Sequence, residues 1–167
     1  NGLNEREIAM GWMQELKRKK WNLKDLTKCF ERIPKRNVFH FNFVMSVYAK
    51  RKKTRRVEEL FERMREENVP QDIFTYNTLM NAYGTNPKKA EEVLTCMKKA
   101  GVRPDILTYT TLMNAYGTNH TKAEKVLTRM IEAGEKPDVT TYNTLMNAYG
   151  TDLMKAEEVL SRMEEAG

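Results

Sequence analysis

The sequence predicts an all-α fold, a right-handed superhelical solenoid built from antiparallel helix pairs. Two observations predict it: segments that recur every 33 residues, and apolar residues inside each segment that are spaced three and four positions apart. Recurrence at 20–50 residues is typical of solenoids and arrays, and the i, i+3, i+4, i+7 spacing places side chains on one face of a helix. No competing period-two pattern predicts a strand.

Each recurring unit is predicted to hold two helices. The first segment reads TYNTLMNAYG, TYTTLMNAYG and TYNTLMNAYG at residues 75–84, 108–117 and 141–150. The second reads KAEEVLTCMKKAG, KAEKVLTRMIEAG and KAEEVLSRMEEAG at residues 89–101, 122–134 and 155–167. Because one helix pair cannot bury its own apolar face, neighbouring pairs must stack.

The ends of these helices have recognisable signals. Asn86 is predicted to be an N-cap, and Pro87 suits the first helical position because its missing N–H has no partner there. Gly101 is predicted to be a left-handed C-cap, and Pro104 follows it. Met80 and its equivalents Met113 and Met146 are predicted to pack in the core.

Two further units are expected upstream. Phe41 lies 35 residues before Tyr76, so this unit is two residues longer, and comparison with the later units places the difference in the turn between its helices. Residues 4–19 and 23–33 predict a degenerate helix pair. The expected units are the N-terminal pair at 1–37, repeats at 38–72, 73–105 and 106–138, and a C-terminally incomplete repeat at 139–167.

The charge is uneven along the chain. The 29 Lys and Arg residues exceed the 23 Asp and Glu residues by six, and residues 1–72 alone carry a net charge of +7. A basic half favours a polyanionic partner, or is simply an exposed, soluble end. The basic runs at 17–20 and 50–53 are either solvated edges or phosphate contacts.

Other functional classes lack their signatures. No apolar run is long enough to span a membrane, no Cys–His cluster has zinc-site spacing, and no P-loop or nucleophile elbow occurs. We therefore expect no metal, no cofactor and no catalytic residue. Cys29 and Cys96 lie in apolar helical patterns and are expected to be small core residues in a reducing compartment. The chain opens on Asn1 without a signal or transit segment, which suggests a mature form or the ordered part of something longer.

The combination Tyr-Asn-Thr-Leu-Met-Asn-Ala-Tyr, Ala-Glu-Glu-Val-Leu and Ala-Gly-Val-Arg-Pro-Asp resembles the pentatricopeptide repeat, strongly over residues 38–167 and weakly over 3–37. The peptide-binding tetratricopeptide repeat is the nearest alternative, but its Trp and Leu-Gly pairing is absent. The resemblance implies binding of single-stranded RNA, usually in a chloroplast or mitochondrion, with one base read per repeat.

The resemblance also implies which residues contact RNA. The base-reading pairs would be Asn42 with Asp72, Asn77 with Asp105 and Thr110 with Asp138, while Asn143 has no partner before the chain stops. By resemblance, Asn with Asp favours uracil and Thr with Asp favours guanine, which gives 5′-U-U-G-pyrimidine. Base-stacking residues would be Phe39, Phe74 and Leu107, with Thr140 as a weaker wedge, and the phosphate contacts would be Lys50, Arg51, Lys52 and Lys53.

Simple chemistry agrees with these roles but does not require them. An Asn amide offers a donor and an acceptor, and an ionised Asp offers acceptors only. Asp105 and Asp138 also precede helices, where an N-cap explains them without RNA; the two roles can coexist because a carboxylate has two oxygens. A scaffold subunit of a ribonucleoprotein or transcription complex is the alternative function, with protein partners or self-association left open. Whether repeats with a 33-residue step stay in register with successive bases is open as well.

Overall fold

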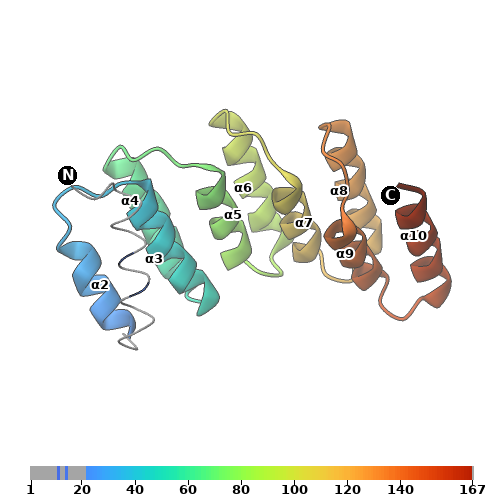
Figure 1. The fold of residues 1–167 in the computed structure, drawn as a ribbon, viewed down its shortest axis with the longest axis horizontal. Coiled ribbons are helices and arrows are strands. Elements are labelled where there is room, and N and C mark those ends of the chain that lie inside the picture. The colour runs from blue at the N-terminus through green and yellow to red at the C-terminus, as the bar shows by residue number, and fades with distance from the viewer. Residues whose placement is uncertain (1–10, 12–13, 15–21, 167) are drawn as a thin grey trace. The chain divides into compact units, whose positions relative to one another are not determined.

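The computed structural model describes residues 11, 14 and 22–166, and these form α-helices and turns without a strand. The chain divides into two compact units, Asn1–Ala82 and Tyr83–Gly167, which are described separately below. Figure 1 shows the helices of each unit in chain order. Only residues 11 and 14 of the predicted helix at 4–19 are described, and both are helical, while the basic run at 17–20 lies outside the described residues.

The first unit contains α2 (Leu23–Glu31), α3 (Val38–Lys50), α4 (Thr54–Glu66) and α5 (Ile73–Ala82). Helix α3 packs against the other three, and α4 also packs against α5. Aromatic side chains pack between these helices. The rings of Phe30 and Phe41 are arranged edge to face with their centroids 5.0 Å apart, and those of Phe61 and Tyr76 with their centroids 5.5 Å apart. Each such pair contributes about 0.5–1.5 kcal/mol beyond the area that it buries.

The second unit contains α6 (Pro87–Lys99), α7 (Ile106–Ala115), α8 (His120–Glu132), α9 (Val139–Tyr149) and α10 (Leu153–Ala166). Helix α7 contacts α6, α8 and α9, and α9 contacts α8 and α10. The first helices of successive pairs, α7 and α9, are therefore neighbours, as α3 and α5 are in the first unit. The predicted all-α arrangement of stacked helix pairs is confirmed.

Several predicted helix ends are confirmed. The side chain of Asn86 accepts a hydrogen bond of 3.1 Å from the backbone of Lys89, and Pro87 is the first residue of α6. Gly101 follows the end of α6 with a φ of 74°, in the left-handed region that glycine adopts without strain. These signals fix where α6 begins and ends.

The expected position of the two missing residues is wrong. The turn after α5 is not shortened; instead α5 and α7 have 10 residues each, against 13 in α3. The cause is the residue after the last tyrosine of each first helix. Gly84 adopts a φ of 56° there and ends the helix, whereas Ala49 follows Tyr48 within α3.

The two cysteines do not both lie in the core. Cys29 is half-buried and Cys96 is exposed, and both are free thiols. The buried stripe of α6 consists of Ala90, Val93, Leu94 and Met97. Cys96 lies one position before that stripe ends, and one position rotates a side chain by about 100° around a helix. The prediction of a core role for Cys96 was therefore wrong.

Candidate nucleic-acid interface

The first unit brings one predicted base-reading pair into direct contact. The amide nitrogen of Asn42, on α3, donates a hydrogen bond of 2.9 Å to Oδ1 of Asp72. The amide oxygen of Asn42 accepts a bond of 2.7 Å from the hydroxyl of Thr75, on α5. These two partners fix which end of the amide carries the donor, because a carboxylate can only accept.

Asp72 has a second role at the start of α5. Its Oδ1 also accepts a 2.8 Å bond from the backbone N–H of Thr75 and lies 2.8 Å from the Thr75 hydroxyl, whose single proton it shares with the amide oxygen of Asn42, while the Asp72 N–H donates to that hydroxyl at 3.2 Å. This reciprocal arrangement is an N-terminal cap. The other carboxylate oxygen, Oδ2, accepts no bond from the described residues. The cap and a role toward a ligand are therefore compatible in one side chain.

The second unit places the pair Thr110 and Asp138 around one pocket of about 370 Å³. Leu107, predicted to stack on a base, and Thr140, the weaker wedge, line the same pocket. The remaining lining residues are Asp105, Ile106 and Glu135. Thr110 and Asp138, which lie 28 positions apart in the sequence, thus line the same pocket in a repeat with the 33-residue step.

The pocket offers mainly hydrogen-bond acceptors. The Thr110 hydroxyl donates its proton to the backbone oxygen of Ile106 at 2.7 Å, so toward a ligand it can only accept. Asp138 uses Oδ1 to cap α9 through Thr141, and Oδ2 has no partner among the described residues. Glu135 adds a third oxygen-bearing side chain. Such a lining suits a base edge that carries N–H groups, and it disfavours a phosphate.

Glu135 is a pocket residue that the sequence analysis missed. It forms an ion pair with Arg103 at 3.1 Å, and Arg103 is largely exposed. Both residues lie in the loops that separate a second helix from the next first helix. Their sequence neighbours, Gly134 and Pro137, mark a turn but do not reveal which way the Glu135 side chain points.

The remaining predicted readers are placed less completely. Asn77 is buried in α5 of the first unit, and Asp105 caps α7 of the second unit through Thr108. Because the two belong to different units, their pairing stays a prediction. Asn143 is exposed on α9. Asn42 and Thr110 are only 7% and 4% exposed, so a ligand can reach no more than the edges of these side chains.

The predicted stacking residues are apolar and exposed. Phe39, Phe74 and Leu107 are 43%, 50% and 57% exposed, while most other large apolar side chains of the first helices are buried. Each lies three positions before a predicted reader, on the same side of its helix. Bases of single-stranded nucleic acid stack on such side chains, at about 1–3 kcal/mol per base for aromatic platforms.

The basic run lies away from the reading pair. Lys50 ends α3, and Arg51, Lys52 and Lys53 form the turn that follows. All four are exposed and form no ion pair with a described residue. Asn42 and Lys50 are eight positions apart on α3, which is about 12 Å along the axis. The run therefore cannot contact the same nucleotide edge as Asn42.

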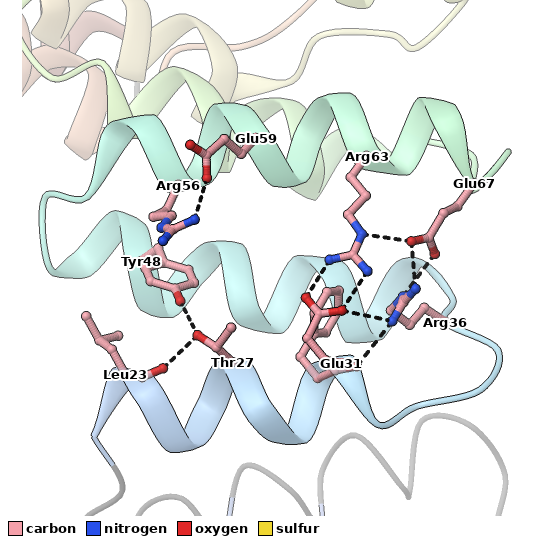
Figure 2. Close-up of polar contacts among 10 residues, drawn as sticks. Leu23, Thr27, Glu31, Arg36, Tyr48, Arg56, Glu59, Arg63 and Glu67 are labelled. Atoms are coloured by element: carbon pink, nitrogen blue, oxygen red, sulfur yellow. Dashed lines mark hydrogen bonds and ion pairs between the residues drawn. The ribbon is translucent and has the colours of Figure 1, made fainter.

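Ion pairs join α2, α4 and the segment between α2 and α3 in the first unit, as Figure 2 shows. Arg63 on α4 binds both oxygens of Glu31 on α2 at 2.6 and 2.7 Å, and Arg36 binds both oxygens of Glu67 at 2.8 and 2.9 Å. Arg63 also donates to Glu67 at 2.9 Å. The hydrogen bond from Arg63 lowers the pKa of Glu31, and the one from Arg36 lowers the pKa of Glu67.

A different contact joins the helix pairs of the second unit. Glu91 on α6 accepts 2.6 and 3.0 Å bonds from Arg129 on α8 and a 2.8 Å bond from the hydroxyl of Tyr116. One step of 33 residues later, Glu124 accepts equivalent bonds from Arg162 and Tyr149. Burial and the bond to Glu124 raise the pKa of Tyr149 to about 12. We call each Glu, Tyr and Arg set a repeat joint.

Models of the pentatricopeptide repeat match three stretches of the chain. The pentatricopeptide repeat domain model matches residues 92–152, and two PPR repeat models match residues 36–85 and 74–102. Together they cover residues 36–152, which is more than half of the chain. The chain belongs to the pentatricopeptide repeat family. A pentatricopeptide repeat-containing protein of Arabidopsis thaliana is 33% identical over 61 residues, which are 36% of this chain and 9% of that protein.

Solved pentatricopeptide repeat structures have the same fold. PPR10 in complex with an 18-nt psaJ RNA element matches with a TM-score of 0.78 at 25% identity, over 92% of this chain and 24% of PPR10. The repeat domain of Arabidopsis thaliana protein-only RNase P 1, in complex with tRNA, matches with a TM-score of 0.73 at 17% identity, over 94% of this chain and 89% of that domain. The chain is thus a helical-repeat solenoid that spans about a quarter of PPR10.

Neither a membrane-spanning helix nor a metal site occurs among the described residues. No helix there has the length and apolar character needed to cross a membrane. No group of three or more His, Cys, Asp or Glu side chains in that range is placed to hold a metal ion.

Proposed function

We propose that this pentatricopeptide repeat protein binds single-stranded RNA selectively, with one base per repeat, without catalysing a reaction. The observation that carries the proposal is the pocket that Thr110 and Asp138 share with Leu107 and Thr140. A pocket that is lined by a pair of polar side chains beside an apolar one suits one splayed-out base. The RNA element bound to PPR10 and the tRNA bound to the RNase P 1 repeat domain support the same ligand class.

The proposed selectivity follows from the hydrogen bonds that remain available. Around Thr110 and Asp138 only acceptors are free, and guanine presents N–H groups on its Watson–Crick edge, whereas adenine presents an acceptor there. Around Asn42 one amide proton and one oxygen lone pair remain, because Asp72 and Thr75 occupy the others. A donor beside an acceptor matches uracil. The proposed core is 5′-U-U-G-pyrimidine.

The cellular role that we propose is the processing, stability or translation of an organellar transcript. Bound protein would shield or position the RNA, in a chloroplast or a mitochondrion. This part rests on the family alone, and fractionation of cells that express the tagged full-length protein tests it. A signal confined to the cytosol would reject the organellar role and leave RNA binding untouched.

The base-reading proposal is tested by fluorescence anisotropy with labelled RNA. The wild-type protein is expected to bind the U-U-G core more tightly than a scrambled oligomer, by about 1–3 kcal/mol for each mismatched contact. Thr110→Asn is expected to shift the preference at the third position from G toward U. Thr111→Asn, the same change at a neighbour outside the pocket, serves as the control. An unchanged preference in Thr110→Asn would falsify base reading by this pair.

A further inference from the structure

A second surface of the first unit has features of a binding site, and the base-reading residues are not part of it. An open groove of about 920 Å³ runs along α2 and reaches the far end of α3 and the start of α4. Leu23, Thr27, Tyr48 and Glu31 line it together with five basic residues, which are Lys24, Lys28, Arg32, Lys53 and Arg56. We call it the α2 groove.

The basic side chains of the α2 groove are available for a ligand. All five are exposed, and Lys24, Lys28, Arg32 and Lys53 form no ion pair with any residue that the structure describes. Arg56 alone is paired, with Glu59 at 2.7 Å. The single acidic side chain of the lining, Glu31, is already held by Arg63, as Figure 2 shows. Among the residues that the structure describes, positive side chains thus outnumber negative ones in the lining of the groove by five to one.

The spacing of these cations indicates an extended ligand. Lys24, Lys28 and Arg32 follow one another at intervals of four residues, so they lie on one face of α2 about 6 Å apart along its axis. A compact anion such as a free phosphate would need cations that converge on one point. A row of cations matches the successive phosphates of an extended single strand.

The floor of the groove adds polar contacts without negative charge. Thr27 donates its proton to the backbone oxygen of Leu23 at 2.8 Å, so the 2.6 Å contact between Thr27 and Tyr48 uses the tyrosine proton. Figure 2 shows this chain of hydroxyl groups between α2 and α3. Both hydroxyl oxygens thus have their protons committed, and the floor is neutral and rigid. The bond between Thr27 and Tyr48 links α2 to α3 and uses none of the basic side chains of the groove.

We propose that the α2 groove binds the sugar–phosphate backbone of single-stranded RNA outside the stretch whose bases are read. This inference rests on the proposed RNA-binding function and extends it. The groove supplies affinity without sequence preference, because phosphate contacts position a strand but do not read it. It divides the predicted phosphate-contact run, since Lys53 lines the groove and Lys50, Arg51 and Lys52 do not.

The test compares three RNAs by fluorescence anisotropy across a salt series. They are the U-U-G core alone, the core with a 5′ oligoadenosine extension, and the extension alone. The groove variant carries Lys24→Gln, Lys28→Gln and Arg32→Gln, because glutamine is a good helix former. The matched control carries Lys98→Gln, Lys99→Gln and Lys125→Gln, which remove the same charge from exposed positions in the second unit.

The groove variant is expected to bind the two RNAs that contain the oligoadenosine extension several-fold more weakly than wild type does. It is expected to bind the core alone as tightly as wild type does. The slope of log K against log salt should fall by about 0.7 for each lost phosphate contact, so by about 2 in total. Equal losses in the groove variant and the control would overturn the proposal, as would an equal loss for the core alone. Stronger competition by polyglutamate than by an oligoadenosine of equal charge would assign the groove to an acidic protein instead. Failure of the core to bind selectively rejects base reading but leaves the result for the extension alone intact.

Discussion

The side-chain amide of Asn42 donates to the carboxylate of Asp72 at 2.9 Å across 30 positions of sequence, and the same carboxylate oxygen caps α5. One side chain thus orients a predicted base reader and starts the helix of the next repeat. The position of the reader is tied to the stacking of the two helices, because α3 supplies Asn42 and the N-terminus of α5 supplies Asp72.

This double role separates two substitutions of Asp72. Asp72→Ala is expected to lower the free energy of unfolding by about 1–2 kcal/mol, because the cap of α5 is lost. Asp72→Asn retains a good cap and is expected to stay within about 0.5 kcal/mol of wild type. Both should weaken selectivity for uracil at the first core position. Urea unfolding followed by circular dichroism, with anisotropy on U and C variants of the core, measures the two effects. Equal stability of both variants would contradict the capping role.

Tyr109 on α7 and Tyr116, which follows the end of α7, are expected to respond differently when the hydroxyl is removed. The hydroxyl of Tyr109 is buried and has no hydrogen-bond partner among the residues that the structure describes, so Tyr109→Phe should leave stability unchanged or raise it by up to about 1–2 kcal/mol. The hydroxyl of Tyr116 donates to Glu91 at 2.8 Å, so Tyr116→Phe should lower stability by about 1 kcal/mol. Thermal unfolding of the two variants gives the comparison. A loss in Tyr109→Phe equal to that in Tyr116→Phe would show that Tyr109 has a partner.

The ion pairs of the first unit predict sensitivity to acid. Arg63 and Arg36 lower the pKa values of Glu31 and Glu67 in the folded state. Their stabilisation is therefore complete above the unfolded carboxyl pKa of about 4.3, and it is lost as pH falls through the lower folded pKa. The midpoint of thermal unfolding should be flat from neutral pH to about 5 and should drop below about 4.

The double variant Glu31→Gln and Glu67→Gln isolates this effect. Its unfolding midpoint should be lower than that of wild type at neutral pH, and its further drop in acid should be smaller. Glu62→Gln is the control, because the ion pair of Glu62 with Arg65 is 60% exposed on both sides and such pairs contribute little. An acid transition of wild-type size in the double variant would place the titrating groups elsewhere.

The glycine that ends α7 gives a prediction free of packing effects. Gly117 has a φ of 56°, and a Cβ added there would meet no atom within 4 Å. Gly117→Ala should therefore lower stability only through backbone strain, by about 1–2 kcal/mol. Gly117→Asn should cost less, because asparagine tolerates this conformation. Chemical unfolding of both variants decides it, and an Ala variant as stable as the Asn variant would refute the strain argument.

Much of the fold was predictable because its signals are local. Asn86 with Pro87 and the left-handed Gly101 mark helix ends within a few residues, and the 33-residue recurrence identifies the units. The two missing residues were wrongly placed in the turn after α5. Counting the residues between Tyr83 and Met97 does not show whether the helix or the turn is the shorter one. The glycine after Tyr83 was the available signal.

The repeat joints were not predicted, although their residues recur with the same step. Glu91 lies on α6, Tyr116 follows the end of α7 and Arg129 lies on α8, and recurrence alone does not reveal which helix faces meet. The same holds for the α2 groove, where Lys24 and Lys28 reach Lys53 only through the packing of α2 on α3. Long-range partners of this kind require the tertiary structure.

The repeat joint has a consequence for how such a chain can grow. Glu91 meets residues 25 and 38 positions ahead, and Glu124 meets its own partners at the same two intervals. A duplicated copy of residues 106–138 would bring a carboxylate for the repeat after it and a guanidinium for the repeat before it. Lengthening by whole repeats keeps every Glu of a repeat joint opposite its Arg, whereas an insertion of another length leaves one of these charges without its partner. Gene duplication can thus extend the array one repeat at a time with the same set of contacts.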